Sequence, residues 1–159
     1  MNGPRVGQGF DIHPFTDDPA RRLTLGGVVF DGERGLVGHS DSDVIAHACT
    51  DALLGAAGLG DIGMLFPDTD ERFAGADSVE LLSVAAARVR DAGWDLQNID
   101  CSVVLEAPKL APQRDLMQAR LTEAAGAPVT VKGKRAEGLG TLGRREGIAA
   151  WAVALVVAR

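Results

Sequence analysis

The hydrophobic pattern of this 159-residue chain changes repeatedly between helical spacing and short runs rich in β-branched residues. Three segments have the helical spacing, and they begin at Ser40, Ser78 and Pro112. The segments typical of strands are 6–15, 99–105 and 129–132, with a strand pair over 23–30. Helices and strands in this irregular order predict an α+β fold, a mixed β-sheet with helices packed on one face. No repeat or linker divides the chain, so we expect a single domain over residues 1–159.

The charge balance limits the kinds of partner. The net charge is −6, which argues against a nucleic-acid partner held through its phosphates. A phosphate-bearing small substrate is compatible with this charge only if local cations or metal ions hold it. The search for chemistry therefore concentrates on metal ligands and clustered basic side chains.

The sequence indicates a cytoplasmic protein without membrane contact. The N-terminal MNGPRVGQGF has neither an apolar core nor an arginine- and serine-rich leader pattern. The longest apolar run, 148–158, is too short to cross a bilayer and is expected to be a buried element. Cys49 and Cys101 have no partner at metal-ligand spacing and are expected to be buried free thiols.

The helix after Ser40 carries both an apolar face and a polar stripe. Ser40 or Asp41 is expected to cap it, and Gly58 and Gly60 to end it. The inward face is formed by Val44, Ile45, Ala48 and Ala52. The stripe beside it consists of Asp43, His47 and Asp51, which are spaced four apart. The glycine- and proline-containing segment 61–70 that follows is expected to be a loop.

The three histidines all lie in the first third of the chain, close to carboxylates. Asp11 and His13 are two apart on a predicted strand, so their side chains share one face. His47 from the next helix would complete a set of two imidazoles and one carboxylate, which suits a catalytic zinc with an open position. Asp51 or a backbone carbonyl would orient its second ring nitrogen. Non-haem iron has the same ligand preference, and ordinary histidines are the alternative.

Two further segments have the chemistry to hold an anion. HSDSDV at 39–44 combines a hydroxyl, a helix start and His39, although plain helix capping by Ser40 explains it equally well. The basic side chains of the last third form a cluster around Glu137, which is either a solvated charge run or a clamp for a diphosphate. This cluster comprises Lys132, Lys134, Arg135, Arg144 and Arg145. No Walker loop is present, and the GQGFD segment opens no helix, so a nucleotide must be held in another way.

Five motifs together resemble the 2-C-methyl-D-erythritol 2,4-cyclodiphosphate synthase family of the non-mevalonate isoprenoid pathway. They are GFDIH at 9–13, the block GHSDSDVIAHACTDALLGAAGLGDIGMLFPDTD at 38–70, ADSVELL at 76–82, EAPKL at 106–110 and GRREGIA at 143–149. The likeness covers essentially the whole chain, and the central block is highly specific. The resemblance implies a homotrimer of α+β subunits, with active sites at the subunit interfaces.

The resemblance also implies roles for individual residues. Zn²⁺ or another divalent ion would be bound by Asp11, His13 and His47, and Mg²⁺ or Mn²⁺ at the diphosphate by Glu137. His39 and Ser40 would hold the substrate 2-phosphate. The expected catalytic residues are His39 and, at a position where the chain departs from the family, Arg135. The methylerythritol side would be lined by Asp61, Ile62, Gly63, Phe66, Pro67, Asp68, Thr69 and Asp70, and Ile12 is a further expected substrate-binding residue. Cytosine would be received by Leu105, Glu106, Ala107, Pro108, Lys109, Leu110 and Ala111, supplied by the adjacent subunit.

The implied reaction is an intramolecular phosphoryl transfer. The 2-phosphate oxygen of a cytidine diphosphate ester attacks the β-phosphorus, CMP leaves, and a cyclic diphosphate forms. One rival interpretation is a metal-dependent phosphohydrolase that gives a linear product. The other is a non-catalytic trimer that binds isoprenoid diphosphates.

The chain departs from the family pattern before and after Glu137. Lys134, Arg135 and Ala136 stand where the family has a run of threonines, and Thr141 replaces a phenylalanine. We expect Arg135 or Lys134 to contact the β-phosphate as a charge-assisted donor; the alternative is that both face solvent. The change at Thr141 affects a second family feature, an apolar cavity on the trimer axis that takes isoprenoid diphosphates, with Arg144 at its phosphate end.

Overall fold

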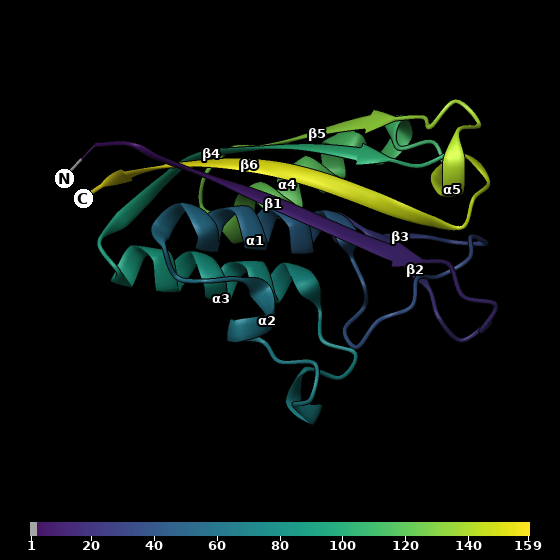
Figure 1. Cartoon of the computed structure of the whole chain (residues 1–159), viewed down its shortest axis with the longest axis horizontal. Helices are drawn as coiled ribbons and strands as arrows, with labels where there is room; N and C mark the ends of the chain where they lie inside the picture. Colours follow the sequence, from purple (N-terminus) through teal and green to yellow (C-terminus); the bar gives the residue numbers. More distant parts are fainter. Residues whose placement is uncertain (1–2) are drawn as a thin grey trace.

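The computed structural model describes residues 3–159 and contains a four-stranded mixed sheet. Its strand order is β1 (Arg5–Pro14), β6 (Gly147–Ala158), β4 (Trp94–Val104) and β5 (Val129–Lys134). β6 pairs antiparallel with both β1 and β4, whereas β4 and β5 are parallel. All three long helices lie on the same side of the sheet (Figure 1). The predicted fold class, a mixed sheet covered by helices on one face, is therefore confirmed.

The long helices are α1 (Val44–Ala57), α3 (Ser78–Asp91) and α4 (Arg114–Ala125). Their apolar faces and the inner face of the sheet form the core, in which Ile45, Leu82 and Met117 are fully buried. The short elements are β2 (Leu23–Leu25), β3 (Val28–Phe30), α2 (Ile62–Leu65), η1 (Glu71–Phe73), η2 (Ala111–Gln113) and α5 (Gly140–Gly143). β2 and β3 form the predicted hairpin, which turns at Gly26 and Gly27.

Several predicted boundaries were wrong. α1 begins at Val44 and is capped by Asp43, whose carboxylate accepts hydrogen bonds from the Ile45 and Ala46 N–H groups. Ser40 and Asp41 lie before the cap, in a turn where Ser42 has a φ of 61°. The predicted loop 61–70 contains the short helix α2, and β4 starts five residues earlier than the predicted strand at Ile99.

Two glycines let β1 lie directly on α1. A Cβ added at Gly7 would lie 2.1 Å from the Ala52 carbonyl oxygen, and one at Gly9 would lie 2.0 Å from that of Ala48. No other residue type leaves room for this backbone-to-backbone contact. Asp11 and His13 continue the same face of the strand, so they also point toward α1.

The opposite face of the sheet carries exposed large apolar side chains. They come from the two neighbouring strands β1 and β6 and are Val6, Phe10, Ile12, Trp151 and Val153. The rings of Phe10 and Trp151 lie 5.0 Å apart. Within residues 3–159, the helices are too short or too polar to span a membrane. Cys49 and Cys101 are buried and free, as predicted.

Candidate metal centre and substrate pockets

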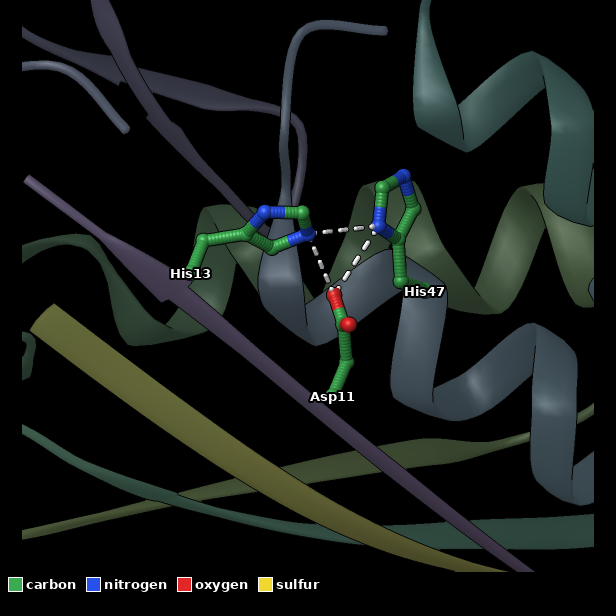
Figure 2. Close-up of side chains that lie close together, drawn as sticks. All are labelled: Asp11, His13 and His47. Atoms are coloured by element: carbon green, nitrogen blue, oxygen red, sulfur yellow. Dashed lines mark hydrogen bonds and ion pairs between the residues drawn. The ribbon is translucent and has the colours of Figure 1, made fainter. Parts of the chain in front are cut away.

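Asp11, His13 and His47 converge on one point between β1 and α1, as Figure 2 shows. Asp11 Oδ2 lies 2.8 Å from His13 Nε2 and 2.9 Å from His47 Nδ1, and the two ring nitrogens are 3.3 Å apart. The three side chains are 12–24% exposed. Their donor atoms therefore meet at the wall of a cavity and leave access for a further ligand. Among the residues that the structure describes, this is the one group of three arranged to hold a metal ion.

Each imidazole is held through its second nitrogen. His13 Nδ1 lies 2.6 Å from the Val37 carbonyl oxygen, which can only accept, so Nδ1 carries the proton and Nε2 is left for a metal. His47 Nε2 faces the hydroxyls of Ser40 and Ser78 at 3.0 Å and 2.8 Å. The prediction that Asp51 or a backbone carbonyl orients His47 was wrong, because two serine hydroxyls face Nε2 and the Asp51 carboxylate accepts from the Ile62 N–H instead. Two imidazole nitrogens and one carboxylate oxygen suit Zn²⁺.

The same contacts shift the protonation of the cluster. Burial alone would raise the pKa of Asp11, but hydrogen bonds and charge interactions with His13 and His47 outweigh it and lower the pKa to about 2. Burial opposes protonation of His13, yet its contact with Asp11 raises the pKa of the imidazole above 6.5. Without a metal ion, these contacts favour an ionised Asp11 beside a protonated His13.

A cavity of about 430 Å³ opens in front of these ligands. Beside the cluster, its lining includes the predicted residues His39, Ser40, Ile62, Gly63, Phe66, Pro67 and Asp68. It also includes Gly38, Phe73 and Leu81, which the sequence reasoning missed. Phe73 could have been identified only through its 5.3 Å ring contact with Phe66, a tertiary feature.

His39 and Ser40 occupy the entrance to α1. His39 Nε2 lies 2.9 Å from the Asp70 carbonyl oxygen, which ties this ring to the 67–70 turn. Ser40 Oγ receives a hydrogen bond from the Ser42 N–H.

Two predicted carboxylates near this cavity cap short helices. Asp70 caps η1 and pairs with Arg72, which lowers the pKa of Asp70 to about 2. Asp61 caps α2 by accepting from the Met64 N–H.

A second cavity of about 420 Å³ collects the residues predicted to receive cytosine. It is lined by Leu105, Glu106, Ala107, Pro108, Lys109, Leu110 and Ala111, together with Lys134 and Arg135. Arg145, a member of the predicted basic cluster, also lines it, and Arg114 and Gly133, which had not been predicted, complete it. Arg135 Nη2 pairs with Glu106 Oε2 at 3.3 Å, and the Gly138 N–H donates to the other carboxylate oxygen at 3.4 Å.

The remaining predicted residues lie outside both linings. The side chain of Ile12 is 49% exposed on the opposite face of the sheet from Asp11 and His13. Glu137 is exposed in the turn between β5 and α5, with a φ of 55°. The others outside the linings are Asp61, Thr69, Asp70, Ala136, Thr141 and Arg144. Arg144 pairs with Glu146 at 3.2 Å.

The fold and site define a protein of the YgbB family, whose sequence model matches residues 4–157, and the chain belongs to this family. A protein of Burkholderia thailandensis is 55% identical over 156 residues, which cover 96% of this chain and 95% of that protein. It is named 2-C-methyl-D-erythritol 2,4-cyclodiphosphate synthase. The resemblance drawn from the sequence motifs is thereby confirmed.

Solved structures agree with this assignment. The bifunctional IspDF of Campylobacter jejuni matches with a TM-score of 0.93 at 42% identity, covering 100% of this chain and 43% of that one. The IspF of Plasmodium falciparum, solved as a CDP complex, matches with a TM-score of 0.86 at 33% identity, covering 100% and 99%.

Proposed function

We propose that the protein is a phosphorus–oxygen lyase that converts 4-diphosphocytidyl-2-C-methyl-D-erythritol 2-phosphate to 2-C-methyl-D-erythritol 2,4-cyclodiphosphate and CMP. The observation that carries this proposal is the convergence of Asp11, His13 and His47 in a chain 55% identical to a protein of that name. An oxygen of the 2-phosphate attacks the β-phosphorus, and the bond from that phosphorus to the oxygen of the departing CMP breaks. The protein contributes position and charge compensation, since no bond to the enzyme is needed.

The first cavity is the proposed site of the attacking 2-phosphate. Asp11, His13 and His47 would hold Zn²⁺, which when bound supplies positive charge beside this phosphate. Ser40 Oγ accepts from the Ser42 N–H, and its own proton could move from the long 3.3 Å contact with Ser78 Oγ to a phosphate oxygen. His39 stands beside it on the cavity wall. Together these groups would orient the phosphate toward the β-phosphorus.

Glu137 is the proposed ligand of Mg²⁺ or Mn²⁺ at the diphosphate. It is a non-glycine residue with a left-handed backbone at the first central position of the 136–139 turn, closed by the Leu139 N–H to Ala136 carbonyl bond. Such a conformation costs roughly 1–2 kcal/mol for an L-residue. Strain of this kind is typical of positions that function constrains, which supports a role for the exposed carboxylate.

Arg135 and Lys134 are the proposed replacements for the family's threonines at the β-phosphate. Both line the second cavity beside the 105–111 segment. The pairing of Arg135 with Glu106 draws its guanidinium toward this cavity. A guanidinium or ammonium donor to a phosphate is stronger than a neutral hydroxyl.

We propose further that the protein is a homotrimer in which two subunits complete each site. The metal cluster and the proposed cytidine pocket line two different cavities of one chain. The exposed face of β1 and β6 presents aromatic and aliphatic side chains of the kind that subunit interfaces bury. Pairing the second cavity of one subunit with the first cavity of its neighbour would bring both halves to one substrate.

Phosphorus NMR of the purified protein with this substrate, Zn²⁺ and Mg²⁺ tests the proposal. Cyclic diphosphate appearing together with CMP is expected, and the signal should not develop with His47→Ala. A linear product beside CMP would show a hydrolase instead. Binding without turnover would show a non-catalytic scaffold.

A further inference from the structure

We infer that Asp41 and Ser78 are positioning residues for the metal ligand His47, because together they fix which of its ring nitrogens carries the proton. This inference rests on the proposed metal site. Ser78 is the first residue of α3 and is fully buried, whereas His47 lies in the second turn of α1. The two residues are 31 positions apart in the sequence.

The proton of the Ser78 hydroxyl is committed to Asp41. Ser78 Oγ donates to Asp41 Oδ1 in a short hydrogen bond, and the Ser78 N–H donates to Oδ2 of the same carboxylate at 3.2 Å. The Asp43 N–H also donates to Asp41 Oδ1, at 3.1 Å. A carboxylate with three such donors is held in place and accepts only. The Ser78 oxygen is consequently left with its lone pairs alone.

His47 Nε2 lies 2.8 Å from that oxygen. Since Ser78 Oγ has no second proton to give, the contact is a hydrogen bond only when Nε2 carries the proton. A neutral imidazole has one proton, so Nδ1 is then unprotonated and its lone pair can bind a metal ion. Nδ1 is the nitrogen that faces Asp11 Oδ2 and His13 Nε2. In the metal-free protein Nδ1 can share a proton with Asp11, and when a cation displaces that proton the Asp41–Ser78 pair favours the tautomer in which all three ligand atoms are available to it.

Ser40 shares this contact but has a different role. Its oxygen is 3.0 Å from His47 Nε2 and accepts from the Ser42 N–H, and its own proton can be donated to Ser78 Oγ at 3.3 Å or to a bound phosphate. Ser40 lines the cavity and can therefore donate to a substrate, whereas Ser78 is fully buried outside that lining and can act only through His47. Removing the Ser78 hydroxyl should weaken metal binding, because hydrogen bonds to the outer nitrogen of a ligating imidazole typically contribute roughly 10–100-fold to affinity.

The experiment compares Zn²⁺ dissociation constants, obtained by chelator competition, for the wild type, Ser78→Ala and Ser78→Thr. We expect Ser78→Ala to bind Zn²⁺ about tenfold more weakly, since Ser40 replaces part of the lost contact, and Ser78→Thr to restore much of the affinity. Ser83→Ala, an exposed serine of the same helix, is the matched control and should bind as the wild type does. Thermal unfolding of each metal-free variant separates a general loss of stability from a specific loss of affinity.

A spectroscopic measurement on the wild type does not depend on how the variants fold. In nitrogen-15 NMR of the Zn²⁺-loaded protein, His47 should show a protonated, exchange-protected Nε2 and an unprotonated Nδ1. A protonated Nδ1, or a Ser78→Ala variant that folds and binds Zn²⁺ as tightly as the wild type, would overturn the inference. A wild type that binds no Zn²⁺ would overturn the proposed metal site itself, which is a different result.

Discussion

Gly9 of β1 and Ala48 of α1 meet backbone to backbone, so closely that a Cβ on Gly9 would lie 2.0 Å from the Ala48 carbonyl oxygen. Asp11 follows Gly9 by two residues on the same face of the strand, and His47 precedes Ala48 on the helix. The separation of these two elements therefore sets the 2.9 Å approach of Asp11 Oδ2 to His47 Nδ1. Packing and metal chemistry are coupled at this contact.

Gly9→Ala should force β1 away from α1. We expect a loss of about 1–3 kcal/mol in unfolding free energy, because a methyl group has no space against backbone atoms. Zn²⁺ affinity should fall with it, since the strand carries two of the three ligands. Denaturant unfolding and chelator competition measure the two effects. Gly55→Ala on α1, where the added Cβ meets only the Gln8 carbonyl oxygen at 3.9 Å, is the control and should leave Zn²⁺ affinity unchanged.

His47→Ala and His39→Ala should separate metal binding from substrate binding. His47→Ala removes a ligand of the cluster, so both Zn²⁺ binding and cyclic product should be lost. His39 lines the same cavity without belonging to the cluster, so His39→Ala should retain Zn²⁺ while turnover drops. Equal Zn²⁺ loss in both variants, measured by metal analysis after dialysis, would contradict this division.

The stability of the metal-free protein should depend on pH through Asp11 and His13. The pKa of Asp11 is lowered from 3.8 to about 2, so its contribution is present above pH 3.8 and is lost as the pH falls toward 2. The pKa of His13 is raised above 6.5, so its contribution is present below pH 6.5 and is lost as the pH rises through the raised value.

Zn²⁺ should change this dependence, because it binds the neutral imidazole. The increase in Tm on adding Zn²⁺ should be larger above the raised pKa of His13 than below pH 6.5. Thermal unfolding with and without Zn²⁺ across this range is the measurement. In the metal-free protein, His13→Ala should remove the loss of stability that occurs as the pH rises above 6.5. An unchanged dependence of Tm on pH in that variant would show that another group titrates in this range.

Arg135→Ala should weaken substrate binding if this guanidinium meets the diphosphate. A hydrogen bond to a charged group contributes about 1.5–3 kcal/mol, so KM should rise about tenfold or more. Lys134→Ala should also raise KM, and the double variant should raise it further than either single change. Arg34→Ala, which removes an exposed cation paired with Asp17, is the control. Unchanged kinetics in the double variant would show that both cations face solvent.

Trp151→Glu should dissociate the proposed trimer. Trp151 is 39% exposed and contacts Phe10 on the uncovered face of the sheet, where a carboxylate would be buried in an interface without a partner. Analytical ultracentrifugation should show a folded monomer, and activity should fall because each proposed site combines residues of two subunits. Val84→Glu on α3, at 48% exposed, should leave both unchanged. A monomeric wild type would contradict the proposed assembly.

The sequence by itself determined the three long helices, the strands that form the sheet and the residue types that can bind metal, but not the short helices α2 and α5. The spacing of Val44, Ile45, Ala48 and Ala52 predicted their burial correctly, because helical periodicity follows from local geometry. The alternation on β1 placed Asp11 and His13 on one face for the same reason. Element ends were predicted less well: Asp43 instead of Ser40 or Asp41 caps α1, since the turn at Ser42 and the contacts of Asp43 with Gly26 and Gly27 decide that position.

Only the tertiary structure decided what surrounds the site. Ser78, Phe73 and Val37 reach the histidines or the cavity from segments distant in the sequence, and no local pattern distinguishes them from other serines, aromatics or loop residues. The positions of the two cavities also depend on tertiary contacts. The packing of α1 on β1 places the first cavity, and the pairing of β4 with β5 places the second. Local periodicity determines which face of a helix or strand a side chain occupies. Which residues it contacts depends on long-range packing, and no local pattern in a single sequence predicts those contacts.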